Sequence, residues 1–371
     1  MRVAVIGAGP VGMAVVSALL TGKGKNHHLF WVVRNEKLRK LLELDGLFVY
    51  FQKRRKLSGS YSPGKGEKLS ELEPREASES RLALHHRIDQ AFYGEPDLKL
   101  AMESVKLLPR VQDLKEAEPE LVISCVKAYD VLPLRAELKG VGNLKLFIAN
   151  GFWLHPGLDL GVFFGGGFSK DNKVSLTRSG RLLIGRIKSP HAEFLFSLTE
   201  EQPAGALVFS LAELELLENF QKSLNKKIVQ VQLCQDIYPV MLKKAIINCV
   251  INPLTALSLS ENGVLLNPWS RGIIQAVLSE ILSALTSAHF LLDEYAELRY
   301  DNILEECERV LTQTKANISS MTMDVLKGRI TEVRFLNQIA ISLGQRYGVE
   351  MPVNATLVSL LQKGVFSQFL P

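Results

Sequence analysis

The chain has 371 residues, of which 47% are hydrophobic and 22% are charged, and its formal net charge is +5. This length suggests two domains, and the apolar fraction is sufficient for packed cores, so wholesale disorder is not expected. The mild positive charge suits an anionic ligand but falls far short of a nucleic-acid-binding signature, and we expect no nucleic-acid partner.

The cysteine and histidine patterns contain no metal-binding or disulfide signature. The 4 cysteines form no C-x-x-C pair, which is typical of reduced intracellular thiols, and the 7 histidines lack a spacing such as H-E-x-x-H. The N-terminus has no long apolar region before a cleavage site, and no run reaches the roughly 18 uncharged apolar residues of a membrane span. We therefore expect a soluble cytoplasmic protein that binds neither a metal nor a membrane.

The first elements predict a parallel sheet. Residues 2–6 (RVAVI) form a short β-branched run that ends in glycine, and residues 11–20 follow with a helical apolar pattern. HLFWVV, residues 28–33, then reads as a second buried strand. A β-α-β unit requires parallel strands joined by a right-handed crossover.

The loop between the first strand and helix has the pattern of a dinucleotide-binding site. GAGPVG fits G-x-G-x-x-G: Gly7 permits the tight turn, Gly9 lets the backbone approach a pyrophosphate, and Gly12 allows close packing of helix on strand. The helix N-terminus adds unpaired N–H groups and a positive dipole end. We therefore expect the cofactor to contact this whole loop, which consists of Gly7, Ala8, Gly9, Pro10, Val11 and Gly12.

The end of the second strand bears on which cofactor is bound. NAD-specific sites usually have an acidic residue here for the ribose 2′-hydroxyl, whereas this chain has Arg34, whose guanidinium suits a 2′-phosphate. The sequence therefore favours NADP (NADPH). A solvent-facing arginine is the alternative, and Glu36 nearby keeps NAD open.

The middle of the chain carries a charged, Ser-, Gly- and Pro-rich stretch, which we interpret as an insertion at about 52–115. Its basic run, residues 53–56, is better explained as a solvated loop than as a nucleic-acid or membrane patch, because acidic residues follow closely. Strand patterns return in four segments, of which the last two could be late strands of the same sheet: 121–126, 144–149, 160–166 and 181–187.

Beyond residue 210 the pattern becomes helical. Glycine and proline thin out, and helical periodicity appears over 210–225, 239–258, 270–294, 297–315 and 331–347. We therefore predict an α/β fold with a Rossmann-type parallel-sheet domain over 1–200 and an all-helical domain over 201–371. The late helices are compatible with a homodimer and equally with internal packing.

One of these helices has an unusual polar stripe. In LKKAIINCVINP, Lys244, Asn248 and Asn252 recur every four residues and so share a sector of roughly 80°. Pro253 is expected to end or kink the helix. The stripe could be an exposed face, but the other faces are apolar, and a buried lysine is costly unless it faces a wet cleft or a charged ligand.

At these residues the chain resembles a known family. KKAIINCVINPLTAL, residues 243–257, is similar to the K-x-x-x-N-x-x-x-N-P-L-T-A-L signature of the ketopantoate reductases (2-dehydropantoate 2-reductases). Further blocks of that family resemble, in order, CVKAYD (125–130), ANG (149–151), ENG (261–263), ISSMTMDVLKGRITEVRFLN (318–337) and VEMPVN (349–354).

The resemblance implies an NADPH-dependent reduction of 2-dehydropantoate to pantoate, a step towards pantothenate and coenzyme A. It implies that Lys244 is the general acid and that Glu332 binds the nascent hydroxyl and positions the substrate. The residues that would hold the small 2-oxo acid are Asn248, Asn252, Asn262 and Ser320. Lys127 and Asn150 would line the cofactor side of the cleft.

Three departures from the family pattern leave alternatives open. Leu242 stands where the family often has tryptophan, Arg334 stands where it has an acid, and the stretch between residues 46 and 121 is much longer. A same-fold reductase of another branched 2-oxo acid is one alternative. A non-catalytic NADP-binding sensor or scaffold is another, although such a protein needs neither Lys244 nor Glu332.

Overall fold

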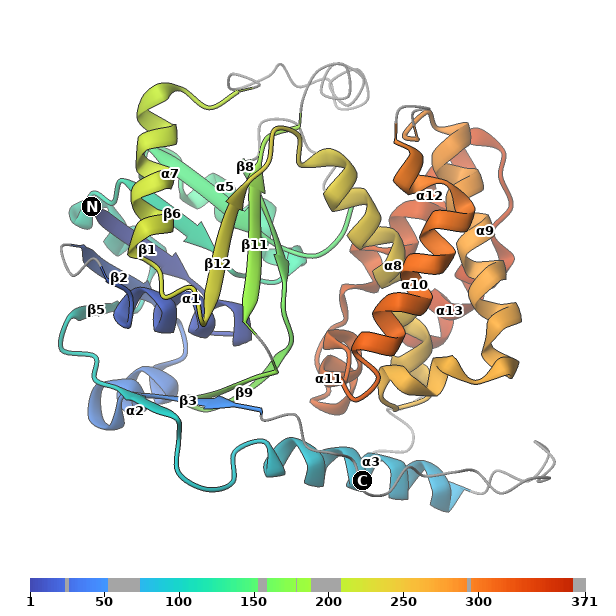
Figure 1. The fold of residues 1–371 in the computed structure, drawn as a ribbon, viewed down its shortest axis with the longest axis horizontal. Coiled ribbons are helices and arrows are strands. Elements are labelled where there is room, and N and C mark those ends of the chain that lie inside the picture. The colour runs from blue at the N-terminus through green and yellow to red at the C-terminus, as the bar shows by residue number, and fades with distance from the viewer. Residues whose placement is uncertain are drawn as a thin grey trace.

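The computed structural model describes residues 1–23, 27–52, 74–152, 159–177, 179–187, 208–291 and 295–362. The basic run at 53–56 lies outside these residues. A twisted sheet with its helices lies beside a bundle of helices, and α8 (Tyr238–Leu257) stands on the bundle side where the two parts meet (Figure 1). The predicted fold class, a Rossmann-type sheet followed by helices, is confirmed.

The main sheet has eight strands, and its six strands from β5 to β8 run parallel to one another. β11 pairs antiparallel with β8, so the predicted late strands do join this sheet, with one reversal of direction. In spatial order the strands are β12 (Val229–Leu233), β11 (Gly180–Gly185), β8 (Asp159–Phe164), β7 (Leu144–Ile148), β6 (Leu121–Ser124), β1 (Arg2–Ile6), β2 (His28–Val32) and β5 (Val105–Leu108).

Helices cover both faces of this sheet. Strands buried on both faces read as continuous apolar runs, as the RVAVI sequence of β1 does. One face packs in a core with α1 and α7, while the other shares its core with α8 and the rest of the bundle. The helical elements of this part are α1 (Pro10–Leu20), α2 (Glu36–Asp45), η2 (Val111–Asp113), α4 (Leu114–Ala117), η3 (Ala128–Asp130), α5 (Val131–Glu137) and α7 (Leu211–Ser223).

Two predicted boundaries differ from the structure. The main sheet continues past residue 200, because its edge strand β12 ends at Leu233, and the purely helical part begins with α8. The segment at 52–115 is also not a pure insertion, because β5 within it forms the other edge of the main sheet. The sequence prediction missed β5 because Lys106 and the surrounding charges interrupt its apolar pattern. A strand at the edge of a sheet tolerates such charges, since it needs apolar residues on only one side.

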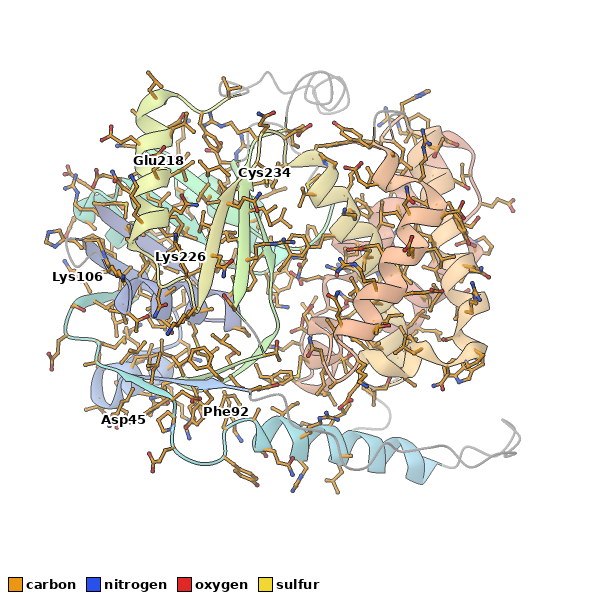
Figure 2. All side chains as sticks on the ribbon, in the orientation of Figure 1. Asp45, Phe92, Lys106, Glu218, Lys226 and Cys234 are labelled. Carbon is orange, nitrogen blue, oxygen red and sulfur yellow. The ribbon has the colours of Figure 1, made fainter. Side chains whose placement is uncertain are left out.

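A second, smaller sheet and a long helix were not predicted. The sheet has the order β4 (Leu98–Leu100), β3 (Leu47–Phe51), β10 (Lys173–Leu176) and β9 (Gly167–Lys170). α3 (Pro74–Gln90) extends from beside this small sheet along the lower side of the helical bundle (Figure 1). Phe92, labelled in Figure 2, follows α3 and packs edge-on against Tyr50 with ring centroids 5.6 Å apart.

The residues around Phe92 connect the small sheet to the helical bundle. They form one apolar cluster with residues from both parts: Tyr50, Leu84, Ile88, Phe92 and Phe168 on one side, and Leu259, Ile318, Met323 and Leu326 on the other. An ion pair between Arg87 of α3 and Glu261 lies beside it. α3 is therefore attached to the bundle as well as to the sheet.

α8 is the central helix of the C-terminal part. It is the one helix in the described chain that is long and apolar enough to cross a membrane, but 72% of that window is buried inside the fold, as in the core helix of a packed domain. The other elements of the bundle are η4 (Asn262–Leu266), η5 (Pro268–Ser270), α9 (Arg271–Ser287), η6 (Ala296–Leu298), α10 (Tyr300–Gln313), α11 (Ser320–Leu326), η7 (Glu332–Phe335), α12 (Asn337–Tyr347) and α13 (Pro352–Gln362).

Pro253 does not end α8, which continues to Leu257. Proline lacks an N–H, so the carbonyl of Cys249, four residues earlier, loses its helical partner. The side chain of Asn337 replaces that partner, because its Nδ2 donates to the Cys249 oxygen at 2.9 Å. Asn337 Nδ2 also donates to Asn354 Oδ1 at 2.8 Å, and both asparagines are completely buried.

We therefore expect Asn337→Leu to destabilise the protein by about 2 kcal/mol, because it leaves a buried carbonyl without a donor. Chemical unfolding would measure the loss, with Gln345→Leu on the exposed face of α12 as the control. An unchanged free energy of unfolding for Asn337→Leu would show that the Cys249 carbonyl does not need this donor.

Candidate active site

The turn between β1 and α1 requires two of its three glycines for steric reasons within the protein. Gly7 has a φ of 103°, and a Cβ there would lie 2.9 Å from the carbonyl oxygen of Cys125. A Cβ on Gly12 would overlap the Gly7 carbonyl oxygen. Gly9 differs, because a Cβ there meets nothing within 4 Å in the described chain. The space in front of Gly9, at the N-terminus of α1, therefore fits the close approach of a phosphate.

Alanine substitutions should separate these roles. We expect Gly9→Ala to leave the thermal unfolding midpoint unchanged and to weaken NADPH binding by roughly tenfold or more, because the new methyl group occupies the phosphate approach. Gly12→Ala should instead lower the unfolding midpoint, because its methyl group clashes with the backbone of Gly7. Equal NADPH affinity in wild type and Gly9→Ala, measured by fluorescence titration, would remove Gly9 from the cofactor site.

The structure places Arg34 just beyond the carboxyl end of β2, next to the predicted cofactor loop in the sheet order. Its guanidinium lies 3.5 Å from Glu137 Oε1, and the side chain is 54% exposed. Exposed ion pairs of this kind contribute little, so Arg34 can be redirected to an anionic ligand. Glu36 begins α2 and pairs with Lys40 at 2.8 Å on the exposed side of that helix.

Four of the predicted site residues meet where the two parts of the molecule face each other. Lys244 Nζ of α8 donates to Asn150 Oδ1, just after β7, at 2.8 Å. Asn150 Nδ2 donates to Glu332 Oε2 of η7 at 3.2 Å. Glu332 Oε1 accepts from the backbone N–H of Ala128 at 3.0 Å, and Lys127 Nζ lies 3.5 Å from Glu332 Oε2. Glu332 is 4% exposed, so its carboxylate is shielded from bulk water.

Lys127 is held by a second carboxylate as well. Its Nζ lies 2.6 Å from Asp324 Oδ2 in α11, and the far side of Asp324 faces Arg329 at 2.9 Å. Burial works to lower the pKa of Lys127, but the charges of Glu332 and Asp324 raise it more, so the net pKa is above its ordinary value. Lys127 therefore stays charged over the physiological range.

For Lys244, burial outweighs the neighbouring negative charge, so its pKa is lowered. Burial lowers its pKa to about 8, and the charge of Glu332 opposes this shift only in part. A proton donor works best when its pKa lies near the operating pH. The ammonium of Lys244 is therefore charged at neutral pH and still able to release its proton.

The four residues predicted to hold substrate are not linked by such a chain of hydrogen bonds in the described part of the chain. Asn248 and Asn252 share the stripe of Lys244 along α8, half-buried and 7% exposed respectively. Asn262 Nδ2 donates to Thr314 Oγ1 at 2.9 Å, while its buried Oδ1 has no hydrogen-bond partner among the described residues. Ser320 is exposed at the start of α11, and the neighbouring Ser319 is the residue that caps this helix.

Sequence reasoning missed two side chains at this site. Asp324 is 1% exposed and joins Lys127 across the interface. A carboxylate inside the apolar run MTMDVL was a usable signal, because a buried charge requires a partner. Phe164, the last residue of β8, lies with its ring centroid 5.7 Å from Lys244 Nζ. No group of His, Cys, Asp and Glu suited to hold a metal occurs in the part of the chain that the structure describes.

A dinucleotide-binding turn in a Rossmann-type sheet, with a half-buried lysine on a helix of the second part, defines a class of protein: a nicotinamide-dependent oxidoreductase. Comparison with known proteins narrows this class. Residues 236–364 match the family described as ketopantoate reductase PanE/ApbA C terminal. The C-terminal part of the chain is therefore similar to the ketopantoate reductases.

Two curated relatives and one solved structure extend this comparison. The 2-dehydropantoate 2-reductase of Aquifex aeolicus is 26% identical over 277 residues, which cover 70% of this chain and 80% of that protein. The 2-dehydropantoate 2-reductase of Vibrio cholerae is 36% identical over 122 residues, 33% of this chain and 39% of that protein. A D-mandelate dehydrogenase solved with NADH and anilino(oxo)acetate has the same fold, with a TM-score of 0.69 at 16% identity, and all of both chains is covered.

Proposed function

We propose that this protein reduces 2-dehydropantoate to pantoate with NADPH, in the cytoplasm and as a step towards pantothenate and coenzyme A. The observation that carries the proposal is the hydrogen bond that holds Lys244 against Asn150 between the sheet and the bundle, with the pKa of the lysine lowered to about 8. A bound nicotinamide would supply the hydride, and the space at Gly9 fits the phosphates of such a cofactor.

The residues of the chain divide the remaining work. Negative charge develops on the carbonyl oxygen during reduction, and the ammonium of Lys244 stabilises this charge and then donates its proton. Asn150 keeps the ammonium in place, and Glu332 orients Asn150 from its other side. Glu332 and Lys244 are thus both assigned to the catalytic site, with Glu332 available to accept from the new hydroxyl.

The substrate carboxylate needs neutral or cationic donors. The amides of Asn248, Asn252 and Asn262 and the hydroxyl of Ser320 are of the right type, and we assign the binding of the 2-oxo acid to them. The unused Oδ1 of Asn262 accepts rather than donates, so it suits a substrate hydroxyl better than the carboxylate. On the cofactor side, Arg34 would bind the 2′-phosphate of NADPH, and Lys127 would lie beside the nicotinamide end with Asn150.

The test is a panel of 2-oxo acids given to the purified protein with NADPH and NADH in parallel, followed by the loss of reduced nicotinamide. We expect 2-dehydropantoate with NADPH to give the highest kcat/KM. Absence of turnover with 2-dehydropantoate, together with turnover of another acid, would replace this substrate while keeping the reaction. A preference for NADH would remove Arg34 from its assigned role.

A different 2-oxo acid is the second candidate. Phe164 brings an aromatic ring to the proton donor, and the D-mandelate dehydrogenase of the same fold was solved with anilino(oxo)acetate, itself an aromatic 2-oxo acid derivative. Phenylglyoxylate therefore belongs in the panel. A sensor without catalysis is disfavoured by the joint positioning of Lys244 and Glu332, and it predicts NADPH binding with no turnover of any acid.

The assembly state is a separate proposal. The bundle carries an apolar groove of about 620 Å³ between α8 and α13, bordered by Trp269, which is 64% exposed. A contact between two bundles would cover such a surface, and we propose a homodimer on this basis. Light scattering of the purified protein decides between a monomer and a dimer.

A further inference from the structure

The carboxyl end of β8 contributes an aromatic side chain to the site. In sheets of this type, ligands bind at the carboxyl ends of the parallel strands. Lys127 follows β6 and Asn150 follows β7 at this edge, and Phe164 is the last residue of the next parallel strand, β8. Phe164 therefore occupies the same edge as two residues of the proton-donor network.

Phe164 faces the helical bundle, whereas its neighbour Phe163 does not. Successive side chains of a strand point to opposite faces of the sheet. Phe163 packs in the core of α1 and α7, next to Gly165 and Gly180, where added methyl groups would overlap its ring. Phe164 packs against the core that contains α8. The pair thus offers one ring at the site and one matched ring on the far face.

Two cations lie close to the ring of Phe164. Lys244 Nζ is 5.7 Å from the ring centroid, and Arg181 Cζ is 5.2 Å from it. Arg181 is the direct cross-strand partner of Phe164 in the β8–β11 pair, so its guanidinium rests on the ring from the neighbouring strand. Both distances are within the roughly 6 Å at which a cation is attracted to an aromatic face.

The ammonium of Lys244 therefore has two different neighbours. An ammonium has three N–H donors, and Asn150 Oδ1 accepts one of them at 2.8 Å. The ring of Phe164 borders it elsewhere and occupies space that water would otherwise fill. We propose that Phe164 is a positioning residue for Lys244: the face of its ring attracts the ammonium, its bulk shields the ammonium from water, and together they direct it at the carbonyl to be reduced. The proposal rests on the general-acid role of Lys244.

The ring acts on the charge of Lys244 in two opposite ways. Its face attracts the ammonium, which favours the charged form, and its bulk excludes water, which disfavours it. Burial is the larger cause, since the pKa of Lys244 is lowered to about 8. Leucine at this position keeps the bulk and removes the attractive face, so the pKa should fall further. Asparagine admits water and should raise the pKa.

The experiment measures the titration of Lys244 directly. Protein labelled with ¹³C at the lysine ε-carbon is titrated by NMR, and the signal of Lys244 is assigned by its absence in Lys244→Met. We expect Phe164→Leu to lower the midpoint by about half a pH unit and Phe164→Asn to raise it by a similar amount. Phe164→Tyr, which keeps the ring face, should restore the wild-type midpoint.

Phe163→Leu is the matched control, because it removes the same ring from the opposite face of the same strand. Its midpoint should equal that of wild type. Midpoints for Phe164→Leu and Phe164→Asn that coincide with wild type would overturn the proposal, and Phe164→Leu alone decides if the asparagine variant does not fold. The basic limb of kcat should shift with the midpoint, while KM for NADPH stays unchanged.

The titration needs neither substrate nor turnover, so the two proposals fail separately. If the midpoint shifts as expected but no 2-oxo acid is reduced, the proposed function fails and the role of Phe164 in setting the charge of Lys244 stands. If 2-dehydropantoate is reduced and the midpoint does not move, the proposed function stands and the role of Phe164 is rejected.

Discussion

Lys244→Met is expected to lower kcat by about 10²- to 10⁴-fold, the range typical of the loss of a general acid. NADPH binding should persist, because the substitution lies on α8 and leaves the β1–α1 turn intact. Lys243→Met, one position earlier on the same helix, is the control and should retain turnover. Turnover by Lys244→Met at the wild-type rate would exclude this lysine as the proton donor.

The pH dependence follows from the same group. In the proposed mechanism the protonated lysine is the active form, so kcat should be level below pH 8, at about the pKa of Lys244, and should fall about tenfold per pH unit above it. The measurement is a kcat profile with saturating substrate. A profile that stays level well above the pKa of Lys244 would mean that another group donates the proton.

Lys244→Met should also make the protein more stable. The pKa of Lys244 is lowered from 10.5 to about 8, so the folded state holds the charged form at a cost on the order of 2 kcal/mol once partial exposure is allowed for. Because the folded pKa is the lower one, this cost is present in full below pH 8 and is relieved as the pH rises towards 10.5. Lys244→Met should therefore raise the unfolding midpoint at pH 7, the usual conflict between activity and stability.

Glu332→Gln is expected to lower kcat by on the order of 10²-fold, because the carboxylate orients Asn150, which in turn holds Lys244. Glutamine has one acceptor oxygen where the two carboxylate oxygens accept from Ala128 N and Asn150 Nδ2. The NH₂ group of the glutamine would therefore face either Ala128 N or Asn150 Nδ2, and two donors cannot form a hydrogen bond with each other. The charge of Glu332 also raises the pKa of Lys244, so the basic limb of the kcat profile should move below pH 8 in the variant.

The exposed Glu350 offers a matched control, and Glu350→Gln should leave both the rate and the profile unchanged. A lower rate for Glu332→Gln with an unmoved profile would indicate that Glu332 acts on the substrate alone. A wild-type rate and profile would place it outside the site.

The sequence predicted the parts of the fold that depend on local patterns. The β-α-β start, the late strands of the main sheet and most helices of the bundle were evident because apolar periodicity and glycine positions are set by neighbours in the chain. The small sheet was not, because β3 pairs with β10 more than a hundred residues later, and such pairings leave no local signal. The single helix predicted at 331–347 is divided in the structure: η7 covers Glu332–Phe335, and the α-helix α12 begins only at Asn337.

The candidate site shows the same division. Lys244 was predicted through its spacing with two asparagines on an apolar helix, and Gly9 through its motif. The connection of Lys244 to Asn150 and of Glu332 to Ala128 depends on how two parts of the chain dock, which no local pattern encodes. Asn337 illustrates the limit well: its identity makes sense only once the carbonyl opposite Pro253 is seen to need a donor.

The hydrogen bonds of the site pass back and forth between early and late segments of the chain, from Lys244 to Asn150, then to Glu332, and from there to the backbone of Ala128. Synthesis on the ribosome proceeds from the N-terminus, and domains generally fold in that order. A nascent chain would complete its cofactor turn long before Glu332 emerges to orient Asn150. In the proposed mechanism, the growing polypeptide would hold its nucleotide while Lys244 was still unanchored, and the capacity for reduction would arrive only with Glu332, in the last fifth of the chain.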